Sequence, residues 1–304
     1  MEIRGMRPDE RSEVHAMLDR AFPNTAKSFF DAQVKNDPYL RPQDTRILLD
    51  GGEIRACVRI YYRTIYCNGE SIRMGGIGDV GTDPDFQGRG YASLLMNDAI
   101  SHMKKNKANV SFLFTRINPF YEKFGYFTLP TYDLILQPEL RNKPISHRPA
   151  DLTQDLNFLN NLYKTTHCHR VGPVVRDPNY WKQQMRFPRV DPDLTWIHEY
   201  QGKPVCYIRG FLFEENFKLL EFGYQEGKEN TVFRLIETMM VKLNKKKIQL
   251  SYLSKKEVDL FTSWPSMVQE NTALMVRLLQ LEDISSSRAL FVPHQVLFWE
   301  SDRF

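Results

Sequence analysis

The sequence has few cysteines, no long apolar run and no signal-like beginning. Its four cysteines (Cys57, Cys67, Cys168 and Cys206) are scattered without a CxxC pair, which argues against a disulfide framework and favours reduced thiols in a cytoplasm. No apolar run approaches the roughly 18 residues that a membrane-spanning helix needs. The charged opening "MEIRGMRPDERSEVH" contains no apolar core of a signal peptide. We therefore expect a cytoplasmic protein that has no membrane partner.

Charge and metal-ligand patterns exclude two further classes. The chain has 41 basic and 37 acidic residues, a net charge of only +4. Its lysine runs at 104–107 and 244–247 have no interleaved aromatic residues that could stack on bases, so nucleic acid is not an expected partner. The stretch "HCH" at 167–169 is followed by no second ligand cluster, and adjacent side chains point in different directions. We therefore expect no metal.

What is present is the composition of a folded protein. The 304 residues are 42% hydrophobic and 12% aromatic, and this length suits two domains. The turns "DGGE" and "CNGE" separate β-rich runs and predict an antiparallel meander. Helical spacing follows from Tyr91 to about Lys105. A similar order of elements begins again after a Pro-rich, charged linker. We predict a mixed α/β (α+β) fold with a first domain at 1–137, a linker at 138–150, a second domain at 151–290 and a tail at 291–304.

A glycine-rich turn, "QGRGYA" at 87–92, opens the predicted helix. Gly88 and Gly90 remove the Cβ atoms that would block an approaching oxygen and permit unusual φ angles. The first amides of a helix have no intrahelical partner and lie at the positive end of its dipole, so they bind anions. An ordinary turn is the alternative. A dinucleotide-binding turn would need a third glycine and a Walker A loop would need G-x-x-x-x-G-K-[ST]; the sequence has neither.

Two sequence motifs that follow one another in a characteristic order favour an anion-binding site over an ordinary turn. "QGRGYA" resembles the Q/R-x-x-G-x-G/A signature of the GNAT acetyltransferase superfamily, which binds the pyrophosphate of acetyl-CoA. "NPFYEKFGY" at 118–126 resembles the segment of that superfamily beside the thioester. The resemblance implies acetyl-CoA as co-substrate. It also implies cofactor contacts from the backbone of Val80 and Thr82, from the turn residues Gln87, Gly88, Arg89, Gly90, Tyr91 and Ala92, and from Asn118, for which an N-cap role is the alternative.

The second half resembles a degenerate copy of the first. Its corresponding turn, "YQEGKENTVF", has a single glycine. A tandem GNAT fold with a degenerate second copy resembles the enhanced-intracellular-survival (Eis-like) branch, and "ALMVRLLQLEDI" at 273–284 is similar to the sequence that follows the second copy there. A sterol-carrier-like third domain comes next in that branch, and we expect it to be missing here. The second domain is then expected to shape the acceptor pocket.

The proton transfers have competing candidates. Tyr121 matches the general acid of many superfamily members, whereas Tyr126 matches the position used in the Eis-like branch and is favoured on that ground. Aromatic core packing is the alternative for one or both. The early part of the preceding strand, "RMGGIG", has no carboxylate, and Asp79 is the acid nearest to it. Asp79 is a candidate base acting through water; hydrogen bonding within the sheet or with a neighbouring arginine is the alternative. By resemblance to the branch, the terminal carboxylate of Phe304 is the other candidate base, unless the tail merely docks.

These observations predict a GNAT-type N-acetyltransferase. It would move an acetyl group to the primary amine of a small molecule or peptide by direct attack in a ternary complex, because no cysteine lies near either motif. The alternative is an acyl-CoA-binding sensor or scaffold without turnover, or transfer of a longer acyl group. The sequence leaves the acceptor and the oligomeric state open.

Overall fold

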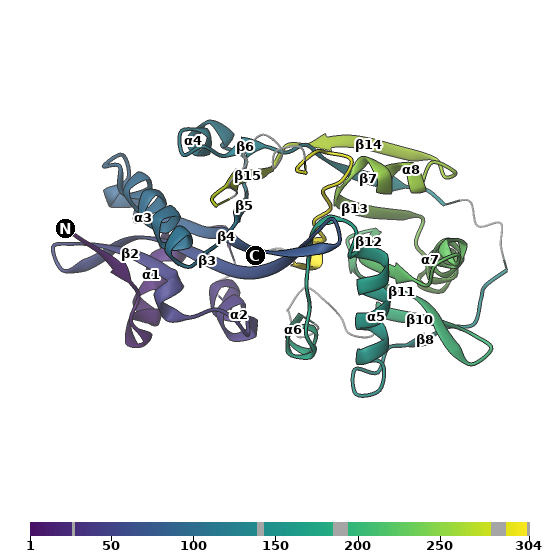
Figure 1. The fold of residues 1–304 in the computed structure, drawn as a ribbon. Helices are drawn as coiled ribbons and strands as arrows, with labels where there is room; N and C mark the ends of the chain where they lie inside the picture. The colour runs from purple at the N-terminus through teal and green to yellow at the C-terminus, as the bar shows by residue number, and fades with distance from the viewer. Residues whose placement is uncertain (26–27, 139–142, 185–193, 281–289, 303–304) are drawn as a thin grey trace.

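The computed structural model describes residues 1–25, 28–138, 143–184, 194–280 and 290–302, which form two β-sheets with helices packed on them (Figure 1). The first sheet has the order β1-β2-β3-β4-β5-β15-β6, with β9 paired to β3. Its strands are β1 Glu2–Gly5, β2 Thr45–Asp50, β3 Glu53–Cys67, β4 Glu70–Thr82, β5 Val110–Phe114, β6 Phe127–Thr128, β9 Val171–Val174 and β15 Leu274–Leu278. This mixed α/β architecture confirms the predicted fold class.

The second sheet has the order β14-β7-β13-β12-β11-β10-β8. Its strands are β7 Thr131–Leu136, β8 Arg148–Pro149, β10 Thr195–Tyr200, β11 Lys203–Phe213, β12 Asn216–Tyr224, β13 Lys247–Leu253 and β14 Ser266–Asn271. The α-helices are α1 Arg11–Ala21, α2 Ser28–Asn36, α3 Tyr91–Lys105, α4 Asn118–Glu122, α5 Leu156–His167, α6 Pro178–Gln184, α7 Glu229–Leu243 and α8 Lys255–Leu260. Within the described ranges, none of these helices is long and apolar enough to cross a membrane.

The antiparallel meander of the first sheet forms as the glycine turns predict. Gly51 and Gly52 join β2 to β3, and Asn68 and Gly69 join β3 to β4; all four have positive φ, the backbone that two-residue hairpin turns require. The chain then crosses over through α3 and returns as β5, which runs parallel to β4. A Cβ at Gly75 would meet the Met103 sulfur at 2.3 Å. The glycine therefore lets α3 pack closely on β4.

Each sheet contains a strand from the far side of the predicted linker. β7 precedes the linker but pairs with β13 and β14 of the second sheet. β9 and β15 lie in the predicted second domain but belong to the first sheet, where β9 pairs with β3 and β15 pairs with β5 and β6. The predicted domain boundaries divide the chain in sequence order, whereas each sheet includes strands from both sides of the predicted linker.

Candidate active site

The strands β4 and β5 separate at the centre of the first sheet. Their parallel pairing ends at Ile77 and Leu113, but β4 continues to Thr82 along β3. Within this continuation, Asp79 and Val80 lie opposite the single residue Val58, so β4 contains a bulge. Asp79 has φ +48 there. Among the described strands, none pairs with this edge of β4 beyond Ile77, so the backbone around Val80 and Thr82 is available to a ligand.

The predicted turn forms a row of open backbone amides. Gly88 and Gly90 have φ +77 and +80, and a Cβ at either would meet no atom within 4 Å. Among the described residues, the five amides from Gly88 to Ala92 have no hydrogen-bond acceptor; the next two, of Ser93 and Leu94, donate to the Gly90 carbonyl. These five N–H groups lie at the positive end of the 15-residue helix α3, which is the arrangement that binds phosphate.

Side chains around these amides are basic and aromatic. The Arg89 and Arg55 guanidinium carbons lie 4.5 Å and 4.0 Å from the Phe86 ring centroid. The Tyr91 hydroxyl donates to the Asp50 carboxylate, which fixes the first turn of α3. Lys123 donates to Ser93 Oγ at 3.3 Å. It is exposed and brings a cation beside the open amides. Its place after the "FYE" motif could have suggested this, but position along the chain does not measure its distance from the turn.

The two candidate tyrosines adjoin one another but differ in their hydroxyl contacts. Their ring centroids are 6.3 Å apart in an edge-to-face arrangement. The Tyr126 hydroxyl lies 2.7 Å from Ser111 Oγ, and that oxygen donates to the Gly75 carbonyl at 2.8 Å, so it accepts the Tyr126 proton. Within the described ranges, the Tyr121 hydroxyl has no hydrogen-bond partner. Burial raises the pKa of Tyr121 to about 12 and also raises the pKa of Tyr126. Both hydroxyls therefore keep their protons at neutral pH.

The two remaining polar candidates of the first half are held by other residues. The Asp79 carboxylate accepts from the buried Arg59 guanidinium and from the Tyr61 hydroxyl at 3.1 Å, the structural role that the sequence analysis gave as the alternative. The Asn118 side chain donates to Thr128 Oγ1 at 2.7 Å and to the Thr272 carbonyl at 2.9 Å. Asn118 thus ties α4 to β6, and Ile117 takes the N-cap position.

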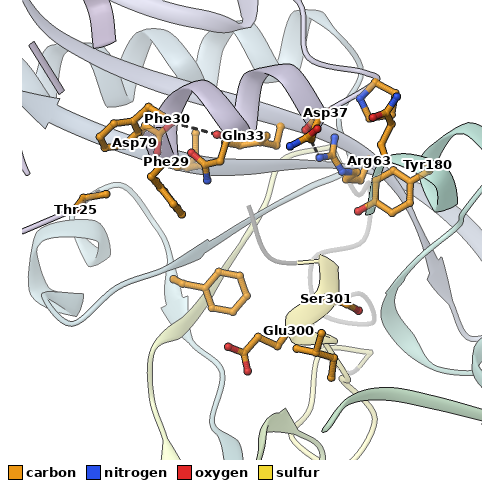
Figure 2. Close-up of a pocket in the computed structure, with 18 of the residues that line it drawn as sticks. Thr25, Phe29, Phe30, Gln33, Asp37, Arg63, Asp79, Tyr180, Glu300 and Ser301 are labelled. Carbon is orange, nitrogen blue, oxygen red and sulfur yellow. Dashed lines mark hydrogen bonds and ion pairs between the residues drawn. The ribbon is translucent and has the colours of Figure 1, made fainter. Parts of the chain in front are cut away.

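A cavity of about 310 Å³ lies where β4 and β5 separate. Gly78 and Asp79 of β4 and Phe114 of β5 line it from the first sheet, and Phe211 and Leu220 line it from the second. Helix α2 supplies Phe29, Phe30 and Gln33, and the C-terminal segment supplies Glu300 and Ser301 (Figure 2). The volume is at the lower end for ligand pockets. Sequence patterns did not mark Gln33 or Glu300, because neither belongs to a motif.

The C-terminal segment lies between the two sheets (Figure 1). Phe298 packs edge-on against Phe114 of β5, with ring centroids 5.1 Å apart. The next residue, Trp299, packs against Phe222 of β12 at 5.2 Å. Both rings are buried. The segment therefore joins the two sheets and delivers Glu300 and Ser301 to the cavity. The candidate base Phe304 lies outside the described residues.

A buried ion network anchors the end of this segment. Arg176 binds Glu221 of β12 through two hydrogen bonds of 2.8 Å and 2.6 Å. The same guanidinium donates to both carboxylate oxygens of Asp302, at 3.1 Å and 2.9 Å. The Tyr180 hydroxyl also donates to Asp302, at 3.1 Å. The Asp302 side chain is thus held by Arg176, which lies between β9 and α6, and by Tyr180 of α6.

His167 gives this anchor a dependence on pH. Its ring lies against Trp299, and burial lowers its pKa from 6.5 to about 3. Below pH 6.5 the His167 imidazole therefore binds a proton in the unfolded chain but not in the folded chain, so lowering the pH favours unfolding. We expect this group to lower the free energy of unfolding by about 2 kcal/mol between pH 6.5 and pH 5. Urea titrations at both values measure it, and His167→Phe should show a drop smaller by that amount; an equal drop in both proteins would contradict the assignment.

Comparisons with known proteins agree with this geometry. Residues 2–128 match the family model described as an acetyltransferase (GNAT) domain. A conserved protein of unknown function from Enterococcus faecalis V583, "Probable N-Acyltransferase", has TM-score 0.77 at 18% identity over 92% of this chain and 73% of its own. A GCN5-related N-acetyltransferase from Kribbella flavida has TM-score 0.73 at 18% identity, over 91% and 72%. Eis1 from Mycobacterium abscessus has TM-score 0.68 at 16% identity, over 93% and 75%. At such identities the likeness shows the fold. A sequence search among curated proteins finds no match.

Proposed function

We propose, from the GNAT acetyltransferase domain that residues 2–128 match, that this protein transfers an acetyl group from acetyl-CoA to the primary amine of a small acceptor. One observation carries the proposal: five consecutive open amides at the start of α3 lie beside strands that separate over a cavity. We also propose a tandem arrangement of the Eis-like kind, because β12, α7 and β13 repeat the parallel crossover of β4, α3 and β5.

The residues of the turn fit a diphosphate. The amides from Gly88 to Ala92 donate to its oxygens, and the absence of Cβ atoms at the two glycines leaves room for them. Arg89 and Lys123 add positive charge at the rim. Acetyl-CoA supplies an acyl group already activated as a thioester. The free edge of β4 around Val80 and Thr82 would then hold the extended arm of the co-substrate beside the cavity.

Direct attack by the acceptor amine suits the chemistry of this chain. The nearest thiol to the bulge is Cys57, which donates to the Asp79 carbonyl at 3.4 Å. Burial raises the pKa of this thiol to about 12, so it stays protonated and is a poor nucleophile at neutral pH. The amine itself is therefore the group that attacks, and the protein's main contribution is to position it.

The leaving thiolate needs a proton donor. Tyr121 is the better placed of the two tyrosines, because its hydroxyl has no partner among the described residues, whereas Tyr126 donates to Ser111. This reverses the preference drawn from the sequence. For the base, Asp79 is engaged by Arg59 and Tyr61. The Phe304 carboxylate, outside the described residues, stays the other candidate base.

The open amides give the test of this function. In Gly90→Val, a branched side chain would enter the space over the amides, and we expect the affinity for acetyl-CoA to fall by roughly 10- to 100-fold, the loss of one or two charge-assisted hydrogen bonds. Gly227→Val is the matched control, because Gly227 has φ +75 and equally open surroundings but opens α7 in the second half. Gly227→Val would introduce similar backbone strain at a positive φ, but it would leave the proposed phosphate site unchanged.

Isothermal titration calorimetry with acetyl-CoA measures both variants. Saturating heat in the wild type and in Gly227→Val, with weak heat in Gly90→Val, is the expected result. No heat in the wild-type protein would overturn the proposal. Release of free thiol on adding an amine distinguishes a transferase from a protein that only binds acyl-CoA.

A further inference from the structure

The cavity contains two polar groups that lack partners. Gln33 of α2 is 7% exposed, and its Oε1 has no hydrogen-bond partner within the described part of the chain. The Glu300 side chain is 12% exposed; its Oε1 lies 2.7 Å from Lys218 Nζ, but its Oε2 is buried and also has no partner there. Figure 2 shows the two side chains on opposite walls of the cavity.

Unpaired buried acceptors indicate a ligand that donates. Leaving such a group without a hydrogen bond costs about 1–3 kcal/mol, and native proteins rarely keep two of them on residues that line one cavity. A primary ammonium carries three N–H donors and no acceptor, so it can donate to more than one such oxygen. The other carboxylates of the lining are already engaged, because Asp37 pairs with Arg63 and Asp79 with Arg59.

The remaining lining is part polar, with residues such as Arg63 and Tyr180, and part aromatic. The aromatic part limits what can be attached to that ammonium. Five phenylalanines line the cavity: Phe22, Phe29, Phe30, Phe114 and Phe211. Hydroxyl groups placed against these rings would lose their hydrogen bonds to water without replacement. An apolar chain or ring would instead gain from burial. The volume of about 310 Å³ suits a small molecule or one side chain.

We infer that the acceptor is a small primary amine with an apolar body, and that its ammonium binds between Gln33 and Glu300. This inference rests on the proposed function, whose amine acceptor it narrows. It favours compounds such as 2-phenylethylamine over polyhydroxylated aminoglycosides and over polyamines, which carry further charges into the aromatic part of the cavity.

The test uses 2-phenylethylamine as the probe, titrated calorimetrically into the full chain in the presence of coenzyme A. Glu300→Gln keeps the shape of the side chain but removes its charge, and we expect it to weaken binding by about 10- to 100-fold, the range for one charge-assisted hydrogen bond. Gln33→Leu should weaken binding by about 3- to 10-fold. Glu226→Gln, an exposed charge change in the second half, should bind as the wild type does. Melting temperatures check that each variant folds.

The following results distinguish this inference from the proposed function on which it rests. The inference holds if Glu300→Gln weakens binding of the amine but not of 2-phenylethanol, which has the same body and no charge. It falls if acetyl-CoA binds normally while 2-phenylethylamine does not bind, or binds equally to the wild type and Glu300→Gln. It also falls if kanamycin or spermidine has the higher kcat/KM in thiol release. If the wild-type protein does not bind acetyl-CoA, both the proposed function and this inference are contradicted.

Discussion

Replacing Tyr121 with phenylalanine should lower kcat by about 100- to 10,000-fold, the usual contribution of a general acid, while acetyl-CoA still binds. The hydroxyl of Tyr121 has no partner among the described residues, and burial raises its pKa to about 12. It therefore carries a proton at neutral pH, and among the described residues that proton has no acceptor. Steady-state kinetics by thiol release and calorimetry with acetyl-CoA measure the two effects separately.

Tyr126→Phe is the matched control, because it removes the neighbouring hydroxyl from the same short segment. This change breaks the hydrogen bond to Ser111, and we expect it to lower stability by about 1 kcal/mol and kcat by less than about tenfold. If Tyr126→Phe causes the larger loss of kcat, the preference drawn from the sequence is correct and Tyr126 is the acid. Unchanged kcat in both variants would exclude either tyrosine as the proton donor.

Replacing Arg176 with methionine should lower the free energy of unfolding by about 3–5 kcal/mol, the cost of removing one partner from a buried ion pair. The guanidinium is fully buried and balances Glu221 and Asp302, which are buried as well. Arg209 lies 3.6 Å from Glu221, so it cannot replace both contacts. Urea unfolding measures the loss. We also expect kcat to fall, since Arg176 is a positioning residue for the segment that carries Glu300 and Ser301 into the cavity.

The control for Arg176 is an ion pair at the surface. Lys255 pairs with Asp259 at 3.0 Å, and both side chains are more than half exposed. Replacement of Lys255 by methionine should cost no more than about 1 kcal/mol. If the two variants differ by less than about 1 kcal/mol, the buried network does not hold the segment in place as described here.

The local parts of the site follow from sequence because they depend on near neighbours. The glycine turn at 87–92 and the hairpins at Gly51 and Gly69 need residues that tolerate positive φ, and the structure has them there. Asp79 was recognised as a candidate, but its ion pair with Arg59 depends on the register of β3 and β4. Spacing along the chain does not fix such a register.

The cavity itself could not be predicted in this way. Gln33 and Glu300 come from opposite ends of the chain and line opposite walls of the cavity. Neither lies in a recognisable motif. The exchange of β7 and β15 was equally hidden, because both are short apolar strands whose partners are chosen by the whole fold. Buried Leu134 and Leu136 of β7 would suit either sheet. Tertiary packing therefore determines the cavity, where we propose that the acceptor binds, and local sequence determines the glycine turn, where we propose that the co-substrate binds.

The exchange of β7 and β15 also constrains how such a protein can evolve. The first sheet contains β9 and β15 from the second half of the chain, and the second sheet contains β7 from the first half. Deletion of either half would therefore leave the other sheet with missing strands and an uncovered edge. Under the tandem arrangement proposed above, this would preserve a second half that had lost its phosphate-binding turn, and selection could reshape its side of the cavity without changing the residues around the open amides.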